Sequence, residues 1–217
     1  MTKRAPLPAG AALLLLAGWT WGCADARPSR DPDAVDAAIA AAAEPPAARG
    51  VVDSLVPIPV ALERFREGLE EPTGLRSPYT SRDALVAAYV DILERADTLA
   101  LEEIAVSRAE YAWLYYPSSI VSRPPYELPP ELAWFQLQGE NRIGALRALR
   151  DLGGRPLEYR GYECLPEPTV EGENRVWAGC VMTVRRNGEP GPAPIKLFGS
   201  ILERGGRFAI LSFANDF

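Results

Sequence analysis

The side chains best suited to acid-base and metal chemistry are scarce in this chain. Its 217 residues include no histidine, the side chain most often used as a general base near neutral pH and the commonest metal ligand. Proton transfer would need a carboxylate, a tyrosine or a lysine with a strongly shifted pKa. Zinc sites of the usual cysteine and histidine type are effectively excluded. We therefore assign no catalytic residue and no metal ligand, and we expect no cofactor.

The start of the chain has the layout of a bacterial secretory signal over residues 1–22. Two basic residues precede a short apolar run, residues 11–18, which falls short of the roughly 20 residues of a membrane span. Cys23 follows the small residue Gly22, and this arrangement resembles a lipoprotein signal-peptidase site, at which Cys23 would carry the lipid that attaches the protein to a membrane. Thr20 departs from the leucine that is usual three positions before such a cysteine. The alternative is secretion without lipid, cleavage near Gly22 or Ala24 leaving Cys23 as a spare thiol.

The composition after this signal separates a tether from a folded part. Residues 23–50 are rich in alanine and proline and hold few large apolar side chains, so they are predicted to be a disordered tether. Removal of residues 1–22 leaves 23 − 2 = 21 basic and 29 acidic residues, a net charge of −8. This charge argues against a nucleic-acid partner, because such binding depends on neutralising phosphates. Residues 51–76 are predicted to hold a helix and a connection, and residues 77–217 an α+β domain.

Aromatic side chains gather in one stretch that is the best candidate for a binding site. Seven of them lie between Tyr111 and Phe135. At helical spacing Trp113 and Tyr116 share one stripe, whereas Tyr111 and Tyr115 share another. One stripe can pack on a sheet, but the second needs another neighbour or a cavity. The candidate pocket residues for a small apolar ligand are Tyr89, Tyr111, Trp113, Tyr116 and Trp134. The alternative is an aromatic core, since such rings dominate core energetics.

Several helices are predicted from periodicity and capping signals. We expect Pro59 in the first turn of a first helix, Thr80 as the N-cap of the clearest helix, Asp97 at the start of a short one and Ser107, with Glu110, at the start of the aromatic one. A last helix is expected from Pro129 or Pro130 to about Leu152, broken or kinked near Gly139 and ended by Gly153 and Gly154.

The last third of the chain is predicted to form four antiparallel strands in sequence order. The expected strands are 157–164, 175–186, 195–203 and 207–213. A turn at residues 171–173 sets Cys164 opposite Cys180 and Tyr162 opposite Met182, and in an exported protein the two cysteines are expected to form a disulfide. Two buried free thiols are the alternative. A Gly205-Gly206 turn pairs Phe198 with Phe213 and Ile201 with Ile210.

Capped helices, a long helix ending in Gly-Gly and a four-stranded meander form an order of elements similar to the nuclear transport factor 2-like superfamily, also called SnoaL-like or ketosteroid-isomerase-like. The resemblance covers about residues 77–217 and implies a curved sheet that wraps the helices into a cone with a ligand site at its open end. An isomerase of this family would use an aspartate base and a tyrosine. Asp91, Asp97 and Tyr89 lie on helices that could border the cone. No spacing assigns them these roles, and a solvated helix face for Asp91 and an N-cap for Asp97 are the simpler interpretations.

Three functions follow from these observations. The first is a non-catalytic binding module tethered to a membrane. The second is an isomerase or cyclase that uses a buried carboxylate within reach of a tyrosine. The third is an envelope scaffold that forms a homodimer through an exposed sheet face bearing Trp177, Val181, Phe198 and Phe213.

Overall fold

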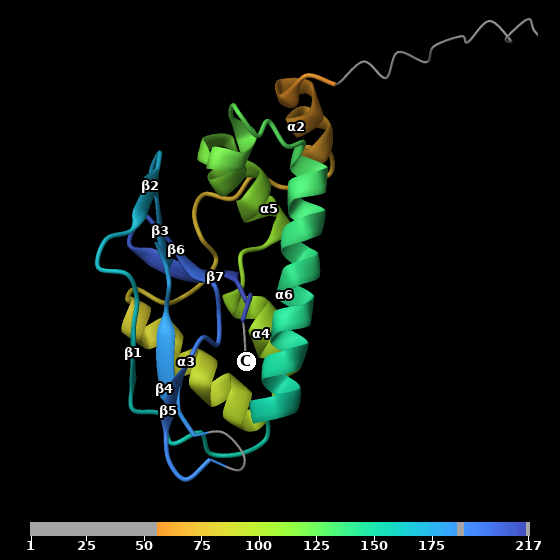
Figure 1. Cartoon of the computed structure of the whole chain (residues 1–217). Helices are drawn as coiled ribbons and strands as arrows, with labels where there is room; N and C mark the ends of the chain where they lie inside the picture. The colour runs from red at the N-terminus through yellow and green to blue at the C-terminus, as the bar shows by residue number, and fades with distance from the viewer. Residues whose placement is uncertain (1–55, 186–188, 216–217) are drawn as a thin grey trace, which may run out of the picture. The chain divides into compact units, whose positions relative to one another are not determined.

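The structure, a computed structural model, describes residues 56–185 and 189–215. The predictions for residues 1–22, for the tether and for lipidation of Cys23 lie outside this part. In the described residues five α-helices precede two antiparallel sheets (Figure 1), so the α+β prediction is confirmed. The helices are α2 (Ile58–Arg66), α3 (Arg82–Arg95), α4 (Thr98–Ile104), α5 (Arg108–Glu110) and α6 (Pro130–Leu152). A π-helical turn, η1 (Tyr111–Tyr115), and two 3₁₀ turns, η2 (Tyr116–Ser118) and η3 (Ile120–Ser122), link α5 to α6.

The helix starts follow the capping signals with one displacement. Asp97 accepts a hydrogen bond from the amide of Ala100, and Ser107 forms the predicted capping box with Glu110. The N-cap of α3 is Ser81, whose hydroxyl accepts from the amide of Ala84, and not Thr80. The two hydroxyl residues are adjacent, and Ser81 is the one with an extended backbone at the helix boundary, which the cap position requires.

The strands form two sheets where the sequence predicted one meander. One sheet has the order β2-β3-β6-β7 and the other β1-β4-β5, all antiparallel. Their bounds are β1 (Gly161–Glu163), β2 (Thr169–Glu171), β3 (Asn174–Ala178), β4 (Val181–Val184), β5 (Ala193–Ile195), β6 (Ser200–Arg204) and β7 (Arg207–Ser212). The second predicted strand is divided at Gly179, whose φ of +64° suits glycine and ends β3 before β4 begins. The third is divided between β5 and β6.

The predicted register holds at the disulfide and at the turns. Tyr162 pairs with Met182, and Cys164 is joined to Cys180 with their Cα atoms 3.9 Å apart. The Gly205-Gly206 turn has positive φ at both positions, and Ile201 pairs with Ile210. The predicted Phe198–Phe213 pair is wrong, because the register shifts by one residue between Ser200 and Ile201. Ser200 therefore pairs with Ser212, and the residues before Ser200 depart from the predicted register.

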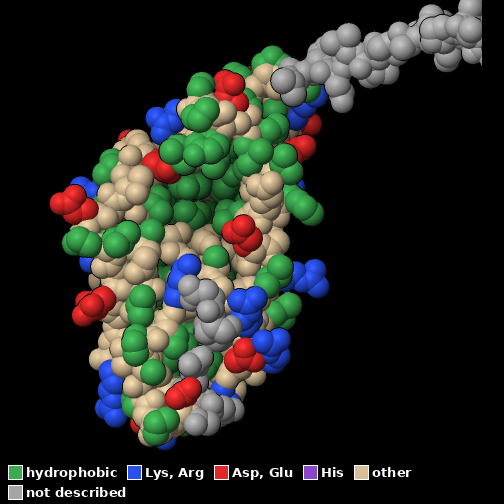
Figure 2. Space-filling model, viewed as in Figure 1, with side chains coloured by type: hydrophobic (Ala, Val, Ile, Leu, Met, Phe, Trp, Pro, Cys, Tyr) green, Lys and Arg blue, Asp and Glu red, His purple; other side chains and the backbone are tan. Residues whose placement is uncertain are grey.

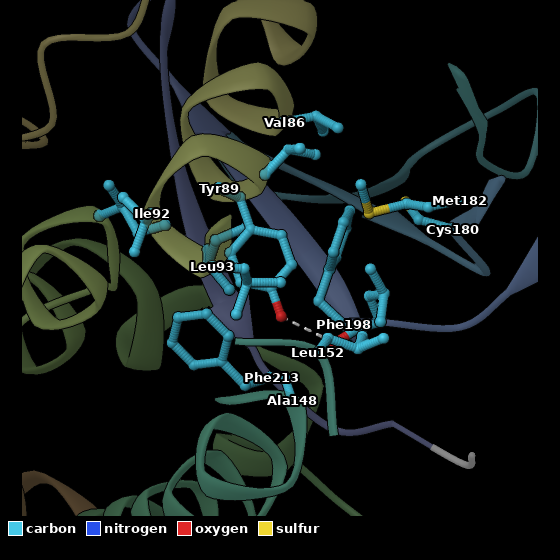
Figure 3. Close-up of a cluster of buried hydrophobic side chains, with 14 of the residues drawn as sticks. Val86, Tyr89, Ile92, Leu93, Ala148, Leu152, Cys180, Met182, Phe198 and Phe213 are labelled. Carbon is cyan, nitrogen blue, oxygen red and sulfur yellow. Dashed lines mark hydrogen bonds between the residues drawn. The ribbon is translucent and has the colours of Figure 1, made fainter. Parts of the chain in front are cut away.

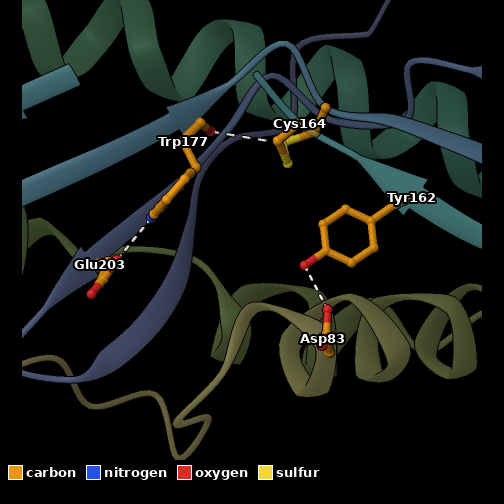
Figure 4. The surroundings of a disulfide bond; sticks show 6 residues. Asp83, Tyr162, Cys164, Trp177 and Glu203 are labelled. Atoms are coloured by element: carbon orange, nitrogen blue, oxygen red, sulfur yellow. Dashed lines mark hydrogen bonds between the residues drawn. A yellow bond between two sulfur atoms is a disulfide. The ribbon is translucent and has the colours of Figure 1, made fainter. Parts of the chain in front are cut away.

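Hydrogen bonds between α3 and β1 and between β3 and β6 lie around the disulfide (Figure 4). The Tyr162 hydroxyl donates to Asp83 over 2.8 Å, and the Trp177 indole N–H donates to Glu203 over 2.8 Å. The guanidinium of Arg82 lies 3.7 Å from the centre of the Trp177 ring. The first turn of α3 is therefore held against both sheets at the point where one sheet passes into the other.

Apolar clusters cover both faces of the four-stranded sheet. Ile201 and Ile210 belong to the cluster that includes α3, whereas Leu202, Ala209 and Leu211 belong to the cluster that includes η1. This alternation along β6 and β7 is the period-two pattern of a sheet buried on both sides.

Tyr89 lies at the centre of the first cluster (Figure 3), with the rings of Phe198 and Phe213 at 5.6 and 5.8 Å. Both phenylalanines are buried. They cannot form part of an exposed dimerisation face together with Trp177 and Val181.

Helix α6 is continuous over 23 residues, so the chain is not broken near Gly139. A second glycine explains how this helix fits: a Cβ at Gly144 would lie 1.9 Å from the carbonyl oxygen of Phe213. Beside it the buried side chain of Asn141 accepts from the Phe213 amide and donates to the Leu211 carbonyl. The helix is thereby fixed along the end of β7 by a close approach and by paired hydrogen bonds.

Candidate functional site

A cavity of about 420 Å³ opens between η1, α6 and the four-stranded sheet. Figure 2 shows the hollow on the face turned toward the viewer, with apolar side chains gathered in it. Tyr111 and Tyr115 supply one wall, and Ala133, Gln136, Leu137 and Glu140 of α6 supply another. The floor is formed by Val176, Ala178, Gly199, Ser200, Leu211 and Ser212.

The cavity exists because most of its floor is made of small residues. Ala178 and Ser200 lie opposite each other on β3 and β6, and Gly199 precedes Ser200. At Gly199 a Cβ would already lie 2.8 Å from the Ser212 hydroxyl. The wall side chains are large and most floor side chains are small. This difference leaves space at a position where the side chains of a sheet normally pack directly against those of a helix.

The aromatic wall is a connected group of rings around Tyr111. Its ring centre lies 4.9 Å from Trp134, 5.7 Å from Tyr115 and 5.8 Å from Tyr116. Burial, followed by the neighbouring Tyr115 and Tyr116, raises the pKa of Tyr111. This phenol therefore stays neutral and presents a rigid, apolar surface to the cavity.

One buried carboxylate approaches the cavity from behind this wall. Glu171, at the end of β2, accepts a hydrogen bond of 3.2 Å from the amide of Ile120 at the start of η3. Burial first, and then the adjacent Glu171 carboxylate, raise the pKa of Tyr115. Glu171 does not line the cavity, so Tyr115 separates its carboxylate from any bound molecule. The only carboxylate on the lining itself is Glu140, which is exposed at the rim.

The π-helical geometry of η1 directs its tyrosines. The amide of Tyr116 donates to the carbonyl of Tyr111, five residues back, which widens the turn. Glu110, buried in the turn before it, accepts from Ser107 and from the backbone amide of Arg76. Together these contacts hold the start of η1, and its Tyr111 and Tyr115 side chains line the cavity.

The structure separates the five aromatic residues predicted to line a pocket. Tyr111 lines the cavity, and Trp134 packs on Tyr111 but lines a separate groove between α4 and α6. Tyr89 and Tyr116 are fully buried, and their hydroxyls donate to the carbonyls of Leu197 and Leu128 over 3.1 and 2.6 Å. They therefore match the core alternative and not the pocket.

Trp113, the fifth, also lies away from the cavity. The Arg66 guanidinium of α2 stacks over its ring at 3.9 Å. The division follows the two predicted stripes: Trp113 and Tyr116 pack elsewhere, while the second stripe, Tyr111 and Tyr115, meets the cavity. Tyr115 was absent from the pocket prediction although its spacing from Tyr111 pointed to it. The small floor residues carried no recognisable signal, because they come from three strands that only the sheet brings together.

The aspartates considered for catalysis have structural roles. Asp91 is exposed and forms an ion pair of 2.8 Å with Arg95, and Asp97 caps α4. Both simpler interpretations are confirmed. Within residues 56–185 and 189–215, no three His, Cys, Asp or Glu side chains are grouped so that they could hold a metal ion. In the same residues no helix has the length and apolar character needed to cross a membrane.

Comparison of the chain with protein-family models, with curated proteins and with solved structures finds no match. The fold and the cavity by themselves define an α+β protein with a partly aromatic, partly open pocket between a long helix and an antiparallel sheet.

Proposed function

We propose that this protein is an exported, membrane-tethered, non-catalytic binding module with a nuclear transport factor 2-like architecture, whose cavity takes a small, largely apolar molecule. The cavity beneath Tyr111 and Tyr115 is the observation that carries this proposal. Its volume of about 420 Å³ falls in the range of roughly 300 to 1,000 Å³ that is usual for small-molecule sites. Its lining combines aromatic and aliphatic walls with a few polar groups, among them Ser200 and Gln136.

The position of the cavity also agrees with the resemblance. In the proposed architecture the meander curves through both sheets, and the ligand enters between the sheet and the helices. The division of the strands at Gly179 supplies the sharp change of direction that such curvature needs. Buried clusters lie on both sides of Ile201 and Leu202 along the rest of the sheet.

An isomerase or cyclase is the second candidate, and one observation favours it. A tyrosine on the cavity wall, Tyr115, lies against a buried carboxylate, Glu171. Binding without catalysis ranks first because Glu171 does not line the cavity and one of its oxygens holds the start of η3. A general base must reach the proton that it removes, and here Tyr115 stands between the two.

Two matched variants on α6 test the binding site. Gln136 is an exposed residue on the cavity, whereas Gln138, also exposed, lines the separate groove between α4 and α6. We expect lipophilic small molecules to raise the Tm of the wild-type protein and of Gln138→Trp, and Gln136→Trp to abolish most of that rise by covering the cavity. No stabilisation by any compound, or equal stabilisation of both variants, would contradict the proposed site.

The Glu171→Gln variant distinguishes a binding module from the catalytic alternative. In a binding module this variant leaves ligand affinity within a few-fold of wild type, and no compound is turned over by either protein. In an isomerase it lowers kcat by about 100-fold or more, because the general base is removed.

Tethering is tested independently: metabolic labelling with a fatty acid should mark the wild-type chain and not Cys23→Ser. An unlabelled wild-type chain would favour secretion without lipid.

A further inference from the structure

Helix α6 carries an apolar stripe that the described chain covers only in part. Leu132, Phe135, Ile143 and Leu146 have 44, 74, 60 and 55% of their surfaces exposed. At 100° per residue these four side chains fall within an arc of about 80° on one side of the helix. Figure 1 shows α6 along the margin of the domain. A helix of a globular protein normally turns such a stripe toward its core, yet here the opposite face of α6 packs on β7.

The stripe has a centre of symmetry at Gly139. Phe135 and Ile143 lie four residues to either side of it, and Leu132 and Leu146 lie seven residues to either side. Gly139 itself is exposed, and a Cβ placed on it would meet no atom within 4 Å. A two-fold axis through Gly139 would therefore set Phe135 of one copy against Ile143 of another, and Leu132 against Leu146. The missing side chain at the centre permits close contact between the two helix backbones.

The exposed area of the stripe suits a dimer of modest stability. The four exposed fractions amount to about 400 Å² of apolar surface per copy, if a large side chain carries roughly 150 to 250 Å². A standard interface buries about 800 Å² per partner, and a little over half of this is apolar. The stripe supplies most of that apolar part. The polar remainder can come from exposed neighbours on α6 such as Gln136, Gln138 and Arg142.

The charges of α6 favour an antiparallel partner of the same sequence. Before Gly139 the helix carries Glu131, and after Gly139 its three arginines, Arg142, Arg147 and Arg150, outnumber the two acidic residues Glu140 and Asp151. Antiparallel pairing places the acidic half of each helix near the basic half of the other, whereas parallel pairing would align like charges. A membrane surface fits less well, because interfacial helices carry mainly lysine and arginine on their polar face, and α6 contains acidic residues and no lysine.

We propose that the protein forms a homodimer through the stripe on α6, with the two-fold axis at Gly139 and the helices antiparallel. This interface differs from the sheet face predicted from the sequence, whose Phe198 and Phe213 are buried in each copy. The inference is independent of which ligand the cavity takes.

Single cysteines in the full chain test the geometry of the pairing. Under mild oxidation Gly139→Cys should form a covalent dimer, because the axis brings the two sulfur atoms together. Arg150→Cys lies on the same side of α6, but eleven residues from the axis, so its two copies are about 33 Å apart and should remain monomeric. Leu132→Cys and Leu146→Cys should cross-link when mixed and not when alone. The wild-type chain gives the background from Cys23.

Sedimentation of the same chain tests the energetics. We expect Phe135→Glu and Ile143→Glu to weaken self-association by at least about 30-fold, as expected for a residue near the centre of an interface, with the far-UV circular dichroism unchanged. Val170→Glu is the control, because Val170 is an equally exposed apolar residue on β2. A wild-type chain that is monomeric at about 100 µM, or a Gly139→Cys chain that cross-links no better than Arg150→Cys, would overturn the proposal.

Discussion

The close approach of α6 to the end of β7 makes Gly144→Ala the most informative substitution in this protein. The new Cβ would lie 1.9 Å from the carbonyl oxygen and 2.6 Å from the carbonyl carbon of Phe213. Both atoms belong to the backbone, so no side-chain rotation can relieve the overlap. Since heavy atoms in contact settle at about 3.5 to 4.0 Å, the helix and the strand must separate by roughly 1.5 Å or more.

That separation would weaken the hydrogen bonds around Gly144. The Asn141 side chain accepts from the Phe213 amide over 2.8 Å, and the Asn215 side chain donates to the Gly144 carbonyl over 2.8 Å. A buried polar group left without its partner costs about 1 to 3 kcal/mol, and overpacking itself costs about 1 to 3 kcal/mol. The helix propensity of alanine returns up to about 1 kcal/mol. We expect Gly144→Ala to lower the free energy of unfolding by about 3 kcal/mol.

Gly139→Ala is the matched control on the same helix. Gly139 has open space around the position of a Cβ, so only the helix propensity changes and the free energy of unfolding should rise by about 0.5 to 1 kcal/mol. Urea unfolding followed by circular dichroism, at a concentration where the chain is monomeric, measures both. If the free energy of unfolding of Gly144→Ala lies within about 0.5 kcal/mol of wild type, Gly144 does not pack against the backbone of Phe213.

Three further predictions concern the disulfide, the tyrosines and the start of α3. Replacing Cys164 and Cys180 with alanine should cost about 3 kcal/mol in urea unfolding, as expected for a closed loop of about 15 residues; reductant should lower the stability of wild type only, and an unchanged wild type would contradict it. Burial raises the pKa of six of the eight tyrosines, so above about pH 10 the unfolded chain releases protons that the folded chain keeps, and stability falls as pH rises. In an alkaline titration most of the tyrosinate absorbance should therefore appear together with unfolding, and a gradual rise in the folded state would refute this. Finally, Ser81→Ala should cost about 1 kcal/mol of the free energy of unfolding and Thr80→Ala much less; the reverse order would restore the predicted cap at Thr80.

Local sequence signals predicted the helix starts and the hairpin turn well, because the interactions that form them join residues only a few positions apart. A hydroxyl or carboxylate at a helix start satisfies amides two or three positions away, which is why Asp97 and Ser107 could be read directly. Adjacent glycines permit the positive φ angles of a tight hairpin, which located the turn between β6 and β7. The cap at Thr80 was wrong by one residue because two neighbouring hydroxyls offer the same chemistry.

The candidate site was less predictable. Tyr111 and Tyr115 form a stripe that pointed to a cavity, but periodicity does not show which of two stripes meets solvent. Tyr89 and Tyr116 have the same residue type, and only the carbonyls that lie opposite their hydroxyls make them core residues. The small floor residues are separated widely in sequence, so the space between them arises only when the strands pair.

The sequence therefore determined the α+β class, the order of the elements and the pairing of Cys164 with Cys180, because each depends on periodicity or on residues close along the chain. The tertiary structure decided where the meander divides into two sheets, why Gly144 and not Gly139 is the critical glycine of α6, and which aromatic rings face a cavity. Those features depend on contacts between segments far apart in the chain, such as Gly144 against Phe213, whose distance no local pattern encodes.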